Sequence, residues 1–434
     1  MISSRMAAFL ARRGIHYGWL VVGITFLTML ATAGAMGSAG VLIRPLTREF
    51  GWTTEEVSTA MAVRLLLFGL LGPFAAALMN NFGIRAVVAT AVTLICGGIF
   101  ASFFMTQLWH LIVLWGIVIG VGTGMTAMVL GATVATRWFH ARRGVVVGLM
   151  TVSNATGQLV FLPLLASLTD HYGWRTALSL TVATLLLALV LMLLLMRNYP
   201  ADIGLAPYGS ETIEPAPPRA ASFGAMLMMP LQVLALAVRR PVFWALFFSF
   251  FVCGLSTNGL IQTHWISMCG DYGIVAVSAA GMLALIGVFD FVGTLGSGWL
   301  SDRFDNRWLL FWFYGLRGLS LILLSMSGFD TLALSAFAVF YGLDWVATVP
   351  PTVKLTAESF GRQQANIVFG WVFTGHQVGA ATATFGAGLI RTDFETFMPA
   401  VYIAGFACLI AALVVLGINR GAKARNHTAV QPAE

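Results

Sequence analysis

Long apolar runs recur from one end of the chain to the other, and they limit the possible folds more than any other feature. A helix needs about 20 apolar residues to cross the hydrocarbon core of a bilayer, because each residue adds about 1.5 Å. The runs are continuous rather than alternating, which predicts helices instead of barrel strands. We expect twelve spans, at residues 17–42, 57–79, 86–105, 109–134, 145–168, 174–196, 242–265, 275–299, 308–328, 332–353, 365–388 and 396–418.

Composition supports the same fold class. Hydrophobic residues make up 59% of the 434 residues and charged residues only 9%, whereas soluble domains carry about 25% charged residues. A soluble core has no room for that much apolar surface. We therefore predict an all-α membrane protein.

Lys and Arg residues are distributed unevenly between the two sides that the spans define. With the N-terminus in the cytoplasm, most of the 24 fall in cytoplasmic segments, and the outer loops hold only Arg44, Arg48, Arg175 and Arg391. This asymmetry follows the positive-inside rule. The basic segments are short and scattered, which argues against a nucleic-acid partner. We expect a multi-pass protein of a bacterial inner membrane with both termini cytoplasmic.

A proline-rich polar segment divides the chain into two sets of six spans. We predict an N-terminal six-helix bundle at 1–197, a cytoplasmic linker at 198–240, and a C-terminal six-helix bundle with a short tail at 241–434. The later part of the linker, about Pro230–Val238, is predicted either as a tether or as a short helix along the membrane surface.

Two similar loops lie about half a chain length apart, at residues 76–85 (AALMNNFGIR) and 298–307 (GWLSDRFDNR). A repeat of this kind is typical of secondary transporters, whose solute site lies near mid-membrane between the halves. The second loop resembles the G-x-L-x-D-R-x-G-x-R motif of the major facilitator superfamily, with Asp305 where the family usually has glycine. The matching residues are Gly298, Leu300, Asp302, Arg303 and Arg307 in the second loop, and Gly83 and Arg85 in the first.

The resemblance implies the major facilitator fold, two pseudo-symmetric six-helix bundles. It also implies that both loops act as a conformational latch, which holds the bundles together in one state. Asn80 and Asn81 replace the expected Asp and Arg in the first loop. We therefore expect a weaker latch in the first half.

Three further segments resemble the monocarboxylate and oxalate–formate porter branch of this superfamily, at 45–52 (PLTREFGW), 137–144 (RWFHARRG) and 173–175 (GWR). Members of the branch tend to carry an Asp and, four residues later, an Arg in the eighth span. Asp290 matches the Asp, but Thr294 stands at the Arg position. Either another cation replaces that Arg, or the solute is not a simple carboxylate.

Four charged residues fall well inside predicted spans: Arg64, Asp290, Arg317 and Asp344. A charge at the bilayer centre costs about 2.5–3.5 kcal/mol, so each needs a partner or a use. At 1.5 Å per residue, the last three lie at one level, about 14 Å from the cytoplasmic helix ends. We interpret them as a structural charge cluster centred on Arg317, or as a proton-coupling site in which Asp290 or Asp344 carries the proton.

Arg64 lies higher, about 22 Å from the cytoplasmic end of its span by the same rise. No acidic residue of the first six spans shares its level. A guanidinium donates two parallel hydrogen bonds to a carboxylate, so Arg64 is our main candidate for binding an anionic solute. The alternative is that its side chain extends to Glu55, to Glu56 or to the lipid interface.

Uncharged polar residues complete the predicted solute site. Asn154 and Gln158 share one helix face, and His376 is able to titrate near neutral pH. For each of the three the alternative is a hydrogen bond within helix packing. Asn258 and Gln262, near the outer end of the seventh span, are weaker candidates. Pro350 and Pro351 predict either a gating bend or the end of the tenth span.

The sequence carries no phosphate loop, nucleophile elbow or metal-binding histidine pair. We therefore predict no enzyme activity, no cofactor and no metal. We predict a monomeric secondary transporter that moves a small organic solute, foremost a carboxylate, by alternating access, either alone or together with protons. The alternative is a proton-driven exporter of a drug or an amphiphilic metabolite.

Overall fold

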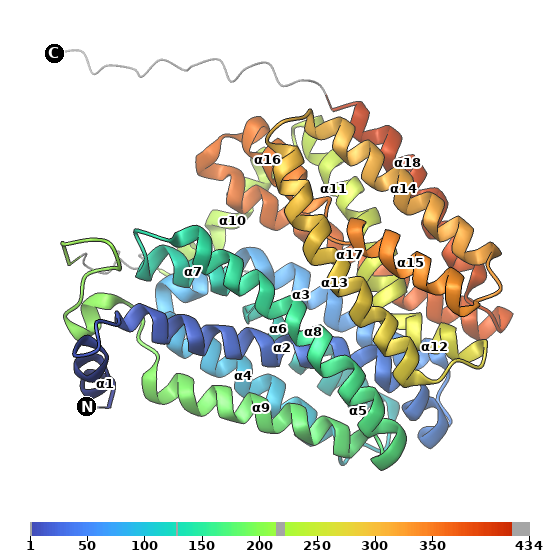
Figure 1. Ribbon diagram of the computed structural model, residues 1–434, viewed down its shortest axis with the longest axis horizontal. Coiled ribbons are helices and arrows are strands. Elements are labelled where there is room, and N and C mark those ends of the chain that lie inside the picture. Colours follow the sequence, from blue (N-terminus) through green and yellow to red (C-terminus); the bar gives the residue numbers. More distant parts are fainter. Residues whose placement is uncertain (1, 127–128, 214–221, 419–434) are drawn as a thin grey trace.

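The computed structural model describes residues 2–126, 129–213 and 222–418, and these residues form a bundle of long helices (Figure 1). Ten spans are long and apolar enough to cross a membrane by length and composition. Two more helices, 30 and 33 residues long, occupy the places of the predicted spans 145–168 and 365–388. The twelve predicted spans are thus confirmed.

In the first half, spans one to three are α2 (Tyr17–Phe50), α3 (Thr54–Phe82) and α4 (Ile84–Ser102), and spans five and six are α8 (Arg143–Tyr172) and α9 (Trp174–Leu195). The fourth span consists of four segments, α5 (Leu108–Leu111), η1 (Ile112–Val118), α6 (Ile119–Thr126) and α7 (Val129–Trp138). In the second half, the seventh span consists of α11 (Pro241–Gly254), η3 (Leu255–Gln262) and α12 (Thr263–Asp271), and the tenth consists of α15 (Thr331–Asp344) and α16 (Val349–Phe360). The eighth, ninth, eleventh and twelfth spans are the single helices α13 (Ala276–Ser301), α14 (Asn306–Met326), α17 (Arg362–Phe394) and α18 (Met398–Leu416). Outside the spans lie α1 (Ile2–Ala11), η2 (Pro200–Ile203) and α10 (Phe223–Ala237).

The helix ends follow local chemistry. At the start of α3, Thr53 and Glu56 form a reciprocal capping box that satisfies free N–H groups. Gly83 ends α3 and begins α4 with φ of +84°, a conformation that favours glycine. The first span runs eight residues past its predicted end at 42, through Pro45 to Phe50. Hydropathy missed this extension because its residues are partly polar.

Each half has its own hydrophobic core. Residues of α2 to α9 form one core, and residues of α11 to α18 form the other, joined by a few side chains from α2 and α8. Among the described residues, the halves meet mainly where α3 packs against α17 and α8 packs against α13, and α2 also contacts α12. At Gly69 a Cβ would overlap the Gln377 side chain, so glycine allows α3 and α17 to approach closely.

Three spans contain irregular backbone. The fourth and seventh include the π-helical segments η1 and η3, and such segments are frequent at functional sites. The tenth span is interrupted at residues 345–348, hereafter the break, and continues as α16. Pro350 and Pro351 lie inside α16, so they follow the break in the tenth span rather than mark its end.

The linker helix α10 begins earlier than the predicted segment at Pro230 and packs against both α3 and α17. The Trp371 indole of α17 donates a 2.9 Å hydrogen bond to the Pro230 carbonyl. Met228 and Met229 are exposed on α10. The helix therefore contacts both halves and also presents an apolar surface.

Candidate functional site

Arg64 projects from α3 into the interior and is only 2% exposed. Its Nη1 and Nη2 donate long hydrogen bonds, of 3.4 and 3.2 Å, to the carbonyls of Ala35 and Met36 on α2. The guanidinium also lies 5.9 Å from the Trp115 ring centroid. Its side chain therefore does not extend to Glu56, whose carboxylate caps α3 at the Thr53 N–H. Among the described residues, no acidic side chain forms an ion pair with Arg64, and its Nε has no hydrogen-bond partner.

Arg64 lines a small cavity between the two halves. Its volume is about 10 Å³, room for one water molecule. The first half contributes Met36, Gly37, Ala39, Gly40, Arg64 and Leu65, and the second half contributes Asn258, Gln262 and Thr263 from the region of η3. The structure thus places the weaker candidates of the seventh span, rather than His376, beside Arg64.

An ion pair between Arg44 and Asp271 joins the two halves at the end of the molecule formed by α12. Asp271 accepts two hydrogen bonds from Arg391 of α17, at 2.9 and 3.1 Å, and lies 3.6 Å from Arg44 of α2. Nearby, the backbone N–H of Glu55 donates to Thr392 at 3.3 Å. These contacts connect the halves at this end of the molecule, although partly exposed ion pairs of this kind contribute only about 0–1 kcal/mol each.

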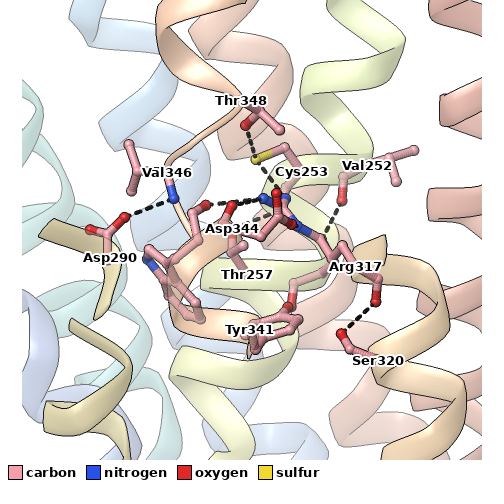
Figure 2. Close-up of polar contacts among 12 residues, drawn as sticks. Val252, Cys253, Thr257, Asp290, Arg317, Ser320, Tyr341, Asp344, Val346 and Thr348 are labelled. Carbon is pink, nitrogen blue, oxygen red and sulfur yellow. Dashed lines mark hydrogen bonds and ion pairs between the residues drawn. The ribbon is translucent and has the colours of Figure 1, made fainter. Parts of the chain in front are cut away.

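A second polar site lies within the second half (Figure 2). Arg317 of α14 is fully buried, and its Nε forms a 2.6 Å ion pair with Asp344 of α15. Its Nη2 donates to the carbonyls of Asp344 and Trp345, at 2.5 and 3.1 Å, and its Nη1 donates to the Cys253 thiol at 3.0 Å. The predicted pairing of Arg317 with Asp344 is thus present.

Asp290 departs from the predicted cluster. Its Oδ1 accepts hydrogen bonds from Thr294, at 3.0 Å, and from the backbone N–H of Val346, at 2.9 Å. Among the described residues it has no ion-pair partner, so Arg317 pairs with only one of the two carboxylates that were predicted at its level. Asp290 and Arg317 instead contact the break from different helices (Figure 2). The depth of each residue in the membrane, read from the sequence, did not show which of the two carboxylates pairs with Arg317.

His376 lies apart from the Arg64 cavity, where α17 faces α11. Its ring stacks on Phe373 and contacts Phe250, and Gln377 lies 3.3 Å from its Nδ1. Cys253, which hydrogen-bonds Arg317, lies against the same histidine. Sequence reasoning missed Cys253 because its spacing gave no signal. Asn154 and Gln158 belong to α8, but their side chains lie outside the described part of the structure.

The two predicted latch loops make equivalent contacts within their own halves. In the first, Asn80 accepts a 2.6 Å hydrogen bond from Arg137 at the end of the fourth span, and Arg85 donates to the Leu193 carbonyl near the end of the sixth. The second loop repeats this pattern with other residues. Its ion pairs and hydrogen bonds are Asp302 with Lys354 at 3.0 Å, Arg307 with the Ile418 carbonyl at 3.1 Å and with Asp305 at 2.7 Å, and Arg303 with the Trp299 carbonyl at 3.3 Å.

These pairs preserve the twofold relation between the halves. The neutral Asn80 still pairs with a cation, so its hydrogen bond replaces the ion pair seen at Asp302. Gly83 allows the Asn198 amide to approach, whereas Gly298 has open space around it. The latch role of these loops stays a prediction.

Two of the segments that resemble the porter branch, 45–52 and 173–175, contact each other where α2 ends and α9 begins. Glu49 accepts hydrogen bonds from the Trp174 indole and from Arg175, each at 2.6 Å. The guanidinium of Arg175 also lies 4.3 Å from the Trp174 ring centroid. These segments therefore join the first span to the sixth and form no part of the Arg64 cavity.

Comparisons with known proteins agree with this architecture. A family model described as Major Facilitator Superfamily matches residues 24–384. Similar curated proteins include the uncharacterized MFS-type transporter YcxA of Bacillus subtilis (23% identity, covering 86% of this chain and 88% of that protein), monocarboxylate transporter 13 of Rattus norvegicus (27%, 92% and 88%) and monocarboxylate transporter 11 of Homo sapiens (27%, 93% and 83%).

Two solved structures share the fold. One is described as a D-xylose-proton symporter, with a TM-score of 0.69, 14% identity and coverage of 92% of this chain and 98% of that one. The other is described as a partially occluded inward open conformation of the xylose transporter XylE from E. coli, with a TM-score of 0.69, 15% identity and coverage of 93% and 99%.

Proposed function

Because this chain belongs to the major facilitator superfamily, whose members are secondary transporters, we propose that it carries a small organic carboxylate, with Arg64 binding the anion. Family membership makes it a transporter rather than an enzyme. The carboxylate and the binding residue are the proposal.

The proposal depends on one observation: among the described residues, the buried Arg64 guanidinium has no ion-pair partner. A buried cation without a counter-ion costs about 2.5–3.5 kcal/mol on insertion scales. Arg64 has five N–H donors, and its two long backbone hydrogen bonds leave Nε–H and neighbouring donors unused. A carboxylate that accepts from Nε–H and one Nη–H compensates the charge and satisfies these donors.

The position of the cavity supports the same proposal. Arg64 faces it from the first half, and Asn258 and Gln262 face it from the second. A solute bound there contacts both halves, as alternating access requires. We propose residues 1–197 and 241–434 as the two moving units, joined by the linker. The small volume of the cavity corresponds to a state closed around Arg64.

Relatives support a carboxylate as the solute, since two of those compared are named monocarboxylate transporters. In this chain Thr294 stands where that branch usually has an arginine, and Thr294 donates a hydrogen bond to Asp290. We propose that Arg64 supplies the missing cation from the opposite half. Asp290 is partly exposed and, among the described residues, not ion-paired, so we propose it rather than Asp344 as the proton carrier.

Uptake of labelled organic acids into proteoliposomes, with and without a pH gradient, tests the proposal. Loss of one charge-assisted contact of about 1.5–3 kcal/mol predicts that Arg64→Ala weakens solute binding about 10- to 100-fold. Arg64→Lys keeps the charge but loses the planar fork, so we expect an intermediate affinity.

Arg48→Ala is the matched control, because it removes one exposed positive charge from the end of α2. Organic-acid uptake by Arg64→Ala that equals wild-type uptake would show that the assignment is wrong. Transport of amphiphilic drugs in place of organic acids would favour the exporter alternative.

A further inference from the structure

The break in the tenth span has a cause in the sequence. Proline has no N–H, so Pro350 and Pro351 donate no helical hydrogen bonds to the carbonyls of Val346 and Ala347 four residues earlier. Both prolines fit the first turn of α16, where N–H groups lack helical partners anyway. Inside a membrane the freed backbone groups need partners from the protein.

Side chains from two neighbouring helices bind three of the four carbonyls from residue 344 to residue 347, and a backbone N–H binds the fourth. On α14, Arg317 donates to the carbonyls of Asp344 and Trp345, at 2.5 and 3.1 Å. On α13, Ser297 donates a 2.5 Å hydrogen bond to the Ala347 carbonyl. The Val346 carbonyl accepts from the Val349 N–H at 2.9 Å. The carbonyls of residues 344 to 347 therefore all have donors.

Asp290 supplies the complementary acceptor on the other side of the break. Its Oδ1 accepts from the Val346 N–H at 2.9 Å (Figure 2). Asp290 and Ser297 lie seven residues apart, about two turns, on one face of α13. Between them, Gly293 approaches α15 so closely that a Cβ there would overlap the Leu343 carbonyl. Two side chains of one helix face thus bind adjacent residues of the break.

The signs of the two charges suit their positions. The C-terminal end of a helix carries partial negative charge, which favours the cation Arg317 at the end of α15. A free N–H carries partial positive charge, which favours the anion Asp290. Titratable groups that act electrostatically on Asp290 include Arg317 of α14, Asp344 of α15 and Cys253 of α11. The charges of Asp290 and Arg317 therefore both support the bent form.

We propose that Asp290, Ser297 and Arg317 are positioning residues that hold the tenth span bent at the break and so set the position of α16. Near its middle α16 carries Lys354, which donates hydrogen bonds to Asp302 and to the Ser301 carbonyl at the end of α13. A change of charge at Asp290 is thereby transmitted along α16 to the latch loop. For Asp290 this positioning role is additional to the proposed proton carriage. The transport test of the positioning role rests on the proposed function, because it requires a transported solute.

Transport separates this role from proton carriage alone. Asp290→Asn keeps an acceptor for the Val346 N–H without the charge, whereas Asp290→Ala loses both. We expect both variants to lose accumulation driven by a pH gradient. Asp290→Ala additionally exchanges solute about fivefold more slowly than Asp290→Asn, because a hydrogen bond of about 1 kcal/mol holding the bend is gone. Ser297→Ala, which leaves the carboxylate in place, shows a similar fall in exchange.

Ser335→Ala is the matched control, because Ser335 bonds only within α15, and we expect it to exchange solute as wild type does. Equal exchange by Asp290→Ala and Asp290→Asn, together with normal exchange by Ser297→Ala, overturns the proposal.

Hydrogen–deuterium exchange tests the hydrogen bond between the Val346 N–H and Asp290 without any transported solute. In the purified full-length protein, amide hydrogens in peptides covering residues 343–349 exchange about fivefold faster in Asp290→Ala than in Asp290→Asn, since only the alanine variant leaves the Val346 N–H without its side-chain acceptor. Peptides of α15 before residue 343 exchange alike in both. Equal rates at 343–349 overturn the proposal whatever the transport assay shows, whereas unequal rates in a protein that moves no carboxylate refute only the proposed function.

Discussion

Removing both charges of the Arg317–Asp344 pair tests what Arg317 contributes to stability. The side chains are 0% and 9% exposed. Removing one partner of a buried pair costs about 3–5 kcal/mol, because the other charge is left without compensation. Replacing both partners with apolar residues of similar volume is often neutral. If Arg317 served only as a counter-ion, Arg317→Met/Asp344→Leu would therefore be about as stable as wild type.

The backbone contacts of Arg317 predict a different result. In the double variant the carbonyls of Asp344 and Trp345 lose their side-chain donor inside the membrane. Each unsatisfied buried group costs about 1–3 kcal/mol. We therefore expect the free energy of unfolding to fall by about 2–6 kcal/mol in the double variant. Arg317→Met alone falls further, since Asp344 then also lacks its counter-charge.

The assay is the free energy of unfolding, measured by SDS titration in mixed micelles for wild type, both single variants and the double variant. Asp305→Asn is a matched carboxyl control, because it removes a partly exposed ion pair with Arg307 while asparagine keeps the helix cap. We expect it to cost less than about 1 kcal/mol. A double variant within about 1 kcal/mol of wild type refutes the reasoning that Arg317 stabilises the break.

Two further predictions concern the cavity between the halves at Arg64 and the packing of α17 against α11. Gln262→Glu places a carboxylate beside Arg64, where it competes with the solute, so we expect it to reduce organic-acid uptake more than Gln262→Ala does; similar uptake in both variants would contradict this. Gly379→Ala brings a Cβ into the Phe251 carbonyl, which is rigid backbone, and should cost about 1–3 kcal/mol of stability. Gly270→Ala meets only the end of a flexible arginine side chain, so its melting temperature in detergent should stay higher than that of Gly379→Ala.

Several features of this protein follow from the sequence alone, because they depend on distance along the chain. Hydropathy and a rise of about 1.5 Å per residue determine how many helices cross the membrane and at what depth each residue lies. The repeated loops at 76–85 and 298–307 indicated two related halves, and the structure repeats their contacts at Asn80 and Asp302. Depth also placed Arg317 and Asp344 at one level, where they pair.

Tertiary packing decided which groups the buried charged side chains bind. Asp290 and Asp344 are predicted at one depth, yet Arg317 pairs with Asp344 while Asp290 binds the Val346 N–H. The direction in which a side chain points depends on the rotation and tilt of its helix. Those depend on contacts such as that of Gly293 with α15, which join residues distant in sequence. The bend of the tenth span is settled in the same way, since prolines free backbone groups but only neighbouring helices provide their partners.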